Sequence, residues 1–164
     1  MASTTSETEP LPKPSLGNLA HLLAFGFGAG CSPKAPGTMG TLLAVAVYLP
    51  LSHLPVAAYV AVLLVVILAG IWLCGKAARD LGVHDHPGIV WDEIAGYLLT
   101  MLGAPAGLLW VVVGFALFRL FDIWKPWPIR WLDRRVGGGF GIMLDDLVAG
   151  AAAALCMQGL ALWS

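Results

Sequence analysis

Long apolar runs without a charged side chain dominate the pattern of this chain. The 41 residues between Lys34 and Lys76 contain no Asp, Glu, Lys or Arg, and neither do the 25 residues between Glu93 and Arg119. A further 18 uncharged residues follow Asp146. A helix on the surface of a soluble protein needs a polar face toward water, and these runs provide none. The pattern therefore predicts helices that face a bilayer.

Turn-forming residues divide the first long run into two helices. A short apolar piece at 19–30 leads into a proline-containing loop, from which Thr38 can cap a helix that ends near Leu51. The segment 52–55 reads as a turn because His and Pro interrupt the apolar run there. Residues 55–74 then supply about 30 Å of uncharged helix, which is enough to cross a hydrocarbon core.

The later apolar runs leave the membrane topology open. Residues 94–118 are long enough to span, but Gly103, Pro105 and Gly107 interrupt them. A kinked span would place Glu93 and Arg119 on opposite faces of the membrane, whereas a helical hairpin would return them to the same face. We favour the hairpin. The last run, 147–163, is at the lower limit for a span.

The charges are scarce and concentrated. Only 12% of the 164 residues are charged, the net charge is -1, and the mean hydropathy is +0.82. This excludes a disordered chain and gives no basic field for nucleic acid. Fifteen of the nineteen charges lie within 76–93 and 119–146. Five basic residues within 119–135 predict that this face is cytoplasmic.

These observations predict an all-α fold, polytopic or inserted as hairpins, with about five to six helices. We expect a tail at 1–16 and a single membrane-embedded domain at 17–164. The charged site should lie at the cytoplasmic face of that domain. Three cysteines in an odd, widely spaced set form no metal or disulfide pattern.

Carboxylates at the edge of a bilayer are costly and require a role there. Three acidic groups stand beside apolar runs and can converge on one face if the hairpin forms. Such a group of carboxylates repels itself unless a hard cation neutralises it, and oxygen ligands suit Mg²⁺. Helix-end stabilisation is the simpler role for each group alone. The groups are Asp92 with Glu93, Asp122, and Asp145 with Asp146.

Cationic and hydroxyl side chains near these carboxylates suit a phosphoryl group. Arg119 and Lys125 flank Asp122 at three-residue spacing and can neutralise phosphate charge. The glycine-rich loop at 28–40 can aim backbone N–H groups and Lys34 at an anion. A role of the basic residues in anchoring to lipid headgroups is the alternative.

Other chemistry gains less support. His84, Asp85 and His86 include two imidazoles and a carboxylate, but no further residue completes a zinc site. The chain lacks the cysteine, aspartate and serine signatures of covalent phosphatases. Hydrolysis of a phosphate ester would therefore need water activated by a metal ion.

Four motifs together resemble those of the phosphatidylglycerophosphatase A family, in the family's order. The resemblance runs from about residue 17 to the C-terminus. The motifs are GFGAGCSPKAPGTMGT (26–41), HDHPGIVWDE (84–93), FRLFDIWKPWPI (118–129) and GGFGIMLDD (138–146).

The resemblance implies a helical enzyme of the bacterial inner membrane. It implies Mg²⁺-dependent hydrolysis of phosphatidylglycerophosphate to phosphatidylglycerol and inorganic phosphate, with the phospholipid held in the bilayer. A homo-oligomer is compatible with it, and no nucleic acid is expected.

Our assignment of roles follows from the residue chemistry above. We expect Mg²⁺ on Asp92, Glu93, Asp122 and Asp146. The phosphate is expected between the metal and Lys34, Thr38, Arg119 and Lys125. Asp85 or Asp145 is expected to take the proton of the attacking water, so that the predicted catalytic residues are Asp85, Asp145, Asp92 and Glu93.

Two other classes are weighed against this function. A small helical transporter or a lipid-binding scaffold without catalysis would place charges along a path across the bilayer, whereas here they gather at one face. A CDP-alcohol phosphotransferase would need a series of aspartates followed by glycine, but Asp92 precedes Glu and Asp146 precedes Leu.

Overall fold

The computed structural model describes residues 11–84 and 86–163, and in these ranges all regular structure is helical. Asp85 therefore lies outside the described residues. Within the described residues, seven α-helices and one 3₁₀-helix follow one another, more than the five to six helices predicted. They are α1 (Leu19–Ala24), η1 (Gly26–Cys31), α2 (Pro36–Leu51), α3 (Val56–Leu81), α4 (Trp91–Thr100), α5 (Leu108–Trp124), α6 (Ile129–Arg135) and α7 (Gly138–Ala161).

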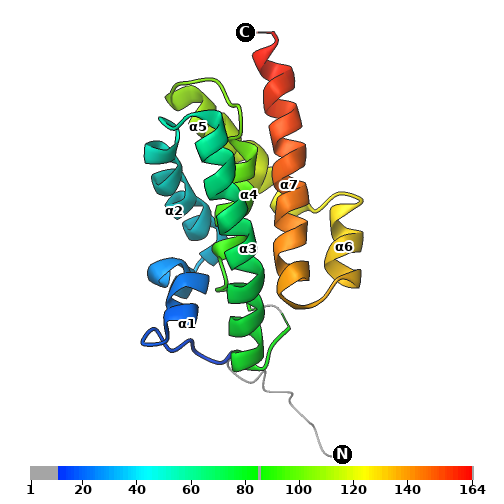
Figure 1. Cartoon of the computed structure of the whole chain (residues 1–164). Helices are drawn as coiled ribbons and strands as arrows, with labels where there is room; N and C mark the ends of the chain where they lie inside the picture. The colour runs from blue at the N-terminus through cyan, green and yellow to red at the C-terminus, as the bar shows by residue number, and fades with distance from the viewer. Residues whose placement is uncertain (1–10, 85, 164) are drawn as a thin grey trace, which may run out of the picture.

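The two longest helices, α3 and α7, run antiparallel side by side (Figure 1). Helix α7 also packs against α4, α5 and α6, so it is the central helix of the fold. Helices α4 and α7 approach closely because each has a glycine where they cross, Gly96 on α4 and Gly150 on α7. A Cβ atom on Gly150 would lie 2.3 Å from the carbonyl oxygen of Gly96.

The predicted break within 94–118 is confirmed. Helix α4 ends at Thr100 and α5 begins at Leu108, so the chain reverses between them (Figure 1). The hydroxyl of Tyr97 donates to the carbonyl of Val111 across this reversal, at 3.1 Å. The two helices therefore form a hairpin, which returns Arg119 to the end of the molecule where Glu93 lies.

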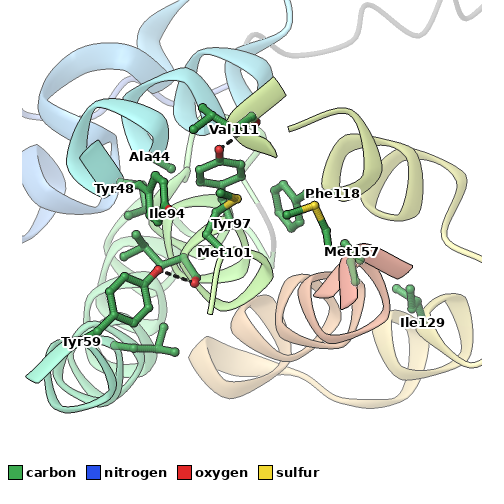
Figure 2. Packing of buried hydrophobic residues seen from close by; sticks show 14 residues of the cluster. Ala44, Tyr48, Tyr59, Ile94, Tyr97, Met101, Val111, Phe118, Ile129 and Met157 are labelled. Atoms are coloured by element: carbon green, nitrogen blue, oxygen red, sulfur yellow. Dashed lines mark hydrogen bonds between the residues drawn. The ribbon is translucent and has the colours of Figure 1, made fainter. Parts of the chain in front are cut away.

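Aromatic residues fill the core between the hairpin, α2 and α3 (Figure 2). Tyr97 makes edge-on contacts with Tyr48 and with Phe118, at ring-centroid distances of 6.2 and 6.3 Å. The hydroxyl of Tyr59 donates to the carbonyl of Leu98 at 2.6 Å. These buried hydroxyls are thus satisfied by backbone oxygens, as burial of a polar group requires.

Three helix boundaries differ from the sequence predictions. Helix α2 begins at Pro36, with Ala35 as its N-cap, so Thr38 does not cap it. Proline suits the first turn because its φ angle is already helical and its missing N–H would have no partner there. Helix α3 extends past the uncharged stretch to Leu81 and ends where Gly82 adopts a left-handed conformation.

The third difference concerns the last helix. The prediction placed Asp145 and Asp146 at its start, but α7 begins at Gly138 and holds them within its length. The glycines that precede them form helix here because they pack closely on α3. A Cβ atom on Gly139 would lie 1.9 Å from the carbonyl oxygen of Ile71.

Two helices are long and apolar enough to cross a membrane. They are α3, with a mean hydropathy of 2.8, and α7, with 1.7, taken over their most apolar windows. Only 22% of the α3 window is buried in the protein, so most of its apolar side chains face outward. At about 39 Å, α3 is longer than a hydrocarbon core, and its charged last turns extend beyond that length.

Candidate active site

Three carboxylates from two helices meet at the centre of the candidate site. Asp92 and Glu93 occupy the first turn of α4, and Asp146 comes from α7. One oxygen from each lies within 4.8 Å of the others. Asp92 is 9% exposed and Asp146 is 4% exposed. The buried atoms Oε2 of Glu93 and Oδ2 of Asp146 accept no hydrogen bond from the described residues.

Such a group fits a bound cation. Buried carboxylate oxygens are costly unless a positive charge or a donor compensates them. A set made entirely of oxygen atoms matches the preference of hard cations such as Mg²⁺ or Ca²⁺. The donor chemistry therefore agrees with a metal site at these three residues.

Asp122, the fourth predicted ligand, stands beside this group. Its carboxylate accepts a hydrogen bond from Nη1 of Arg119 one helical turn earlier on α5. Its carboxyl group is also near that of Asp146. Asp122 thus connects the arginine to the carboxylates.

The start of α2 closes over the same site. A Cβ atom on Gly37 would lie 2.3 Å from Oε1 of Glu93 and 3.1 Å from Nη1 of Arg119. Only glycine leaves room for this approach. The buried Nε of Arg119 donates no hydrogen bond to any described residue, so the guanidinium retains a donor for an anion.

Burial and neighbouring charges act on the carboxyl groups of the site. Burial, together with the charge of Asp146, raises the pKa of Glu93 to about 8. This shift is expected where several carboxylates share a desolvated space without a compensating cation. A bound cation would favour the ionised form.

Asp145 takes part in a second ion pair, with Lys125, and is not one of the three carboxylates that meet at the centre of the site. Nζ of Lys125 lies 2.5 Å from Oδ2 of Asp145 and 3.1 Å from Oδ1 of Asp133. Burial alone would lower the pKa of Lys125, but the hydrogen bonds to the two aspartates raise it above its usual value. Lys125 is therefore a fixed positive charge on one flank of the site.

The remaining predicted residues are placed differently. Lys34 is exposed in the turn before α2, and Thr38 is half-buried in the first turn of that helix. His86 is fully engaged, because Nδ1 accepts from the N–H of Gly88 and Nε2 bonds the carbonyl of Pro12. With both ring nitrogens occupied, His86 has none left for zinc.

Sequence reasoning missed two residues of the site. Asp133 is a partner of Lys125, and its signal was a lone acidic residue in the basic segment after Asp122. Gly37 was noted only as part of a loop. Its role in the approach of α2 to Glu93 depends on contacts between distant segments, and no local pattern encodes those.

An all-helical fold that gathers carboxylates beside an arginine is compatible with a helical phosphatase whose site is built from oxygen ligands. The chain belongs to the phosphatidylglycerophosphatase A family, whose model matches residues 22–161. It is therefore an enzyme, and its reaction is that of a phosphatase. The family resemblance seen in the four sequence motifs is confirmed.

Two curated relatives carry the name of this family. Phosphatidylglycerophosphatase A of Escherichia coli is 50% identical over 85% of this chain and 81% of its own length. The protein of the same name from Haemophilus influenzae is 42% identical over 96% of this chain and 98% of its own. No solved structure matches the chain significantly.

Proposed function

We propose that this protein is a Mg²⁺-dependent lipid phosphatase that converts phosphatidylglycerophosphate and water to phosphatidylglycerol and inorganic phosphate. Family membership supports the reaction, and the meeting of Asp92, Glu93 and Asp146 beside Arg119 supports the metal. Water attacks the terminal phosphorus, the bond from phosphorus to the glycerol oxygen breaks, and that oxygen takes up a proton.

Asp92, Glu93 and Asp146 would hold the Mg²⁺, with Asp122 as a further ligand. Their oxygen chemistry and the two buried oxygens without a hydrogen bond support this choice. When bound, Mg²⁺ would lower the pKa of a water molecule and screen the phosphate oxygens.

The basic residues would bind and orient the phosphate. Arg119 carries a buried donor beside the carboxylates and can neutralise the charge of the transferred group. Lys34, Thr38 and the first N–H groups of α2 would complete the anion site, because Gly37 brings that helix end against Arg119. Lys125 would add its charge from the other flank.

Asp145 is the general base in this proposal, with Asp85 as the alternative. Asp145 is 6% exposed and lies next to Asp146 in the sequence, but Lys125 binds it. That pairing orients the carboxylate, and Asp145 would accept the proton of the attacking water and pass it toward the leaving oxygen.

The enzyme would lie in the bacterial inner membrane with its site facing the cytoplasm. Helices α3 and α7 would cross the bilayer, and the α4–α5 hairpin would enter it from the cytoplasmic side and place its turn at the periplasmic face. The turns at 52–55 and 101–107 carry no charged residue, whereas the site end carries most of the charges. This distribution favours a lipid enzyme over a transporter, which needs polar groups across the bilayer.

Phosphate release by the purified full chain tests the function. We expect release from phosphatidylglycerophosphate in mixed micelles, its loss with EDTA, and its return with excess Mg²⁺. Activity that persists after complete chelation would reject the metal, and no release from this lipid under any metal condition would reject the substrate.

A further inference from the structure

An open groove runs along the outer face of α5, and Arg119 of the candidate site is among its lining residues. It has a volume of about 550 Å³, within the range of small-molecule sites. Arg119 and Arg130 line it together with apolar side chains of α5. The lining residues are Ala116, Arg119, Leu120, Ile123, Trp124 and Arg130.

The two arginines have different partners. Arg119 is bound to Asp122 and belongs to the metal and phosphate site. Arg130 is exposed, forms no ion pair with the described residues, and donates only to the carbonyl of Trp124, at 3.3 Å. The guanidinium of Arg130 therefore stands at the groove with charge and donors available for a second anion.

The other cations of this segment are engaged or lie elsewhere. Lys125 pairs with Asp145 and Asp133, and Arg135 stacks over the ring of Trp131 at 5.7 Å. Arg134 lines a neighbouring hollow but not this groove. Arg130 is thus the cation that the structure places beside Arg119 on the groove.

The floor of the groove suits lipid. Leu120 is 52% exposed, Ile123 is 70% exposed and Trp124 is 63% exposed, all on one side of α5. Exposed apolar side chains next to an arginine match the boundary between acyl chains and headgroups, where tryptophan is also enriched.

We propose that Arg130 binds the phosphodiester of the substrate and so determines specificity for a lipid that carries two phosphates. This inference rests on the proposed function. In phosphatidylglycerophosphate one glycerol unit separates the terminal phosphate from the phosphodiester that leads to the acyl chains. With the terminal phosphate at Arg119, the groove leads the diester to Arg130 and the acyl chains along Leu120 and Ile123. Arginine suits this task because its planar fork binds phosphate oxygens in pairs.

The two products report separately on the two ends of the substrate. Phosphatidylglycerol keeps the diester and lacks the terminal phosphate, whereas inorganic phosphate carries only the latter. When each product is used as an inhibitor of the enzyme, its inhibition constant therefore measures binding at one end of the site.

The test is steady-state kinetics of the full chain in mixed micelles with Arg130→Gln, Arg130→Lys and the control Arg134→Gln. For Arg130→Gln we expect KM for phosphatidylglycerophosphate to rise about tenfold, as for loss of a charged hydrogen bond, while kcat changes less than about twofold. Inhibition by phosphatidylglycerol should weaken in parallel and inhibition by inorganic phosphate should not. Arg130→Lys should recover part of the loss.

Several outcomes would overturn the proposal. Unchanged KM in Arg130→Gln, an equal rise in Arg134→Gln, or an equal weakening of both inhibitors would each reject it. An effect on kcat alone would assign Arg130 to the chemical step or to the fold instead. A wild-type chain that releases no phosphate would reject the proposed function itself, which is a different result from an active enzyme that is indifferent to Arg130.

Discussion

Glu93 on α4 and Asp146 on α7 approach each other with carboxylate oxygens within 4.8 Å, although the two residues are far apart in the sequence. Two negative charges at this separation in a buried setting repel strongly. Because neither Oε2 of Glu93 nor Oδ2 of Asp146 accepts a hydrogen bond from the described residues, a cation is the natural compensation.

Neutralising this pair should abolish metal-dependent activity. We expect Asp146→Asn and Glu93→Gln each to lower kcat/KM by at least about 100-fold. This is more than is typical for a residue that only hydrogen-bonds to a metal ligand. Phosphate release at saturating and limiting Mg²⁺ measures this. Asp80→Asn is the matched control, since Asp80 pairs with His21 and Lys76 away from the cluster. Activity of Asp146→Asn near that of the control would contradict the metal assignment.

Metal binding should strengthen as the pH rises toward 8. Below its raised pKa of about 8, Glu93 holds a proton, which a cation must displace. The affinity for Mg²⁺, measured by calorimetry between pH 6.5 and 8.5, should therefore rise by up to about tenfold per pH unit below the pKa. Glu93→Gln should flatten this dependence, and an equally steep slope in that variant would assign the proton to another group.

Adding a single methyl group at the start of α2 should damage the site. A Cβ atom on Gly37 would lie 2.3 Å from Oε1 of Glu93, so Gly37→Ala must displace either that carboxylate or α2. We expect a loss of about tenfold in kcat/KM and a destabilisation of about 1–3 kcal/mol, as in overpacked cores. Gly159→Ala is the matched control, because its Cβ atom meets nothing within 4 Å. A fully active Gly37→Ala would show that α2 does not shape the site.

Lys125 and Asp145 should act as a unit. Either Lys125→Met or Asp145→Asn leaves one buried or half-buried group without its partner at 2.5 Å, so each should cost activity and lower the melting temperature. The double variant should lose less than the sum of the single losses, because each single change already removes the shared ion pair. Strict additivity in both measurements would argue against coupling.

The hairpin should place its turn across the membrane from α6. In a variant without Cys31, Cys74 and Cys156, a single cysteine replacing Ala106 should react with a membrane-impermeant thiol reagent from the periplasmic side. A single cysteine replacing Arg134 should react only after the membrane has been permeabilised. Labelling of both positions from one side would reject the proposed insertion.

Much of the helical division could be predicted from local sequence. The turn at 52–55 and the break near Pro105 are confirmed, because proline and glycine act on the backbone within a few residues. The boundaries of α3 and α7 were less predictable. Both helices extend through polar or glycine-rich segments because packing against each other supplies the stability that local propensity lacks.

The candidate site was predictable in its residue types and not in its pairings. Carboxylates are rare in this chain and stand beside apolar runs, and this pattern predicts Asp92, Glu93 and Asp146 as site residues. Nothing local distinguishes Asp145 from Asp146. Yet Asp145 forms an ion pair with Lys125, whereas Asp146 lies beside the carboxylates of α4. Adjacent residues on a helix point about 100° apart, so the rotation of α7 against its neighbours decides between them.

The amino-acid sequence by itself determined that the chain is helical and apolar, with its few charges gathered beside the four motifs. Composition and spacing act locally, and a stretch without charge is apolar in any fold. The tertiary structure alone decided which carboxylates meet, that Gly37 touches Glu93, and that Arg130 shares a groove with Arg119. Those contacts join segments distant in the chain, and they exist only once the α4–α5 hairpin and α7 have packed together.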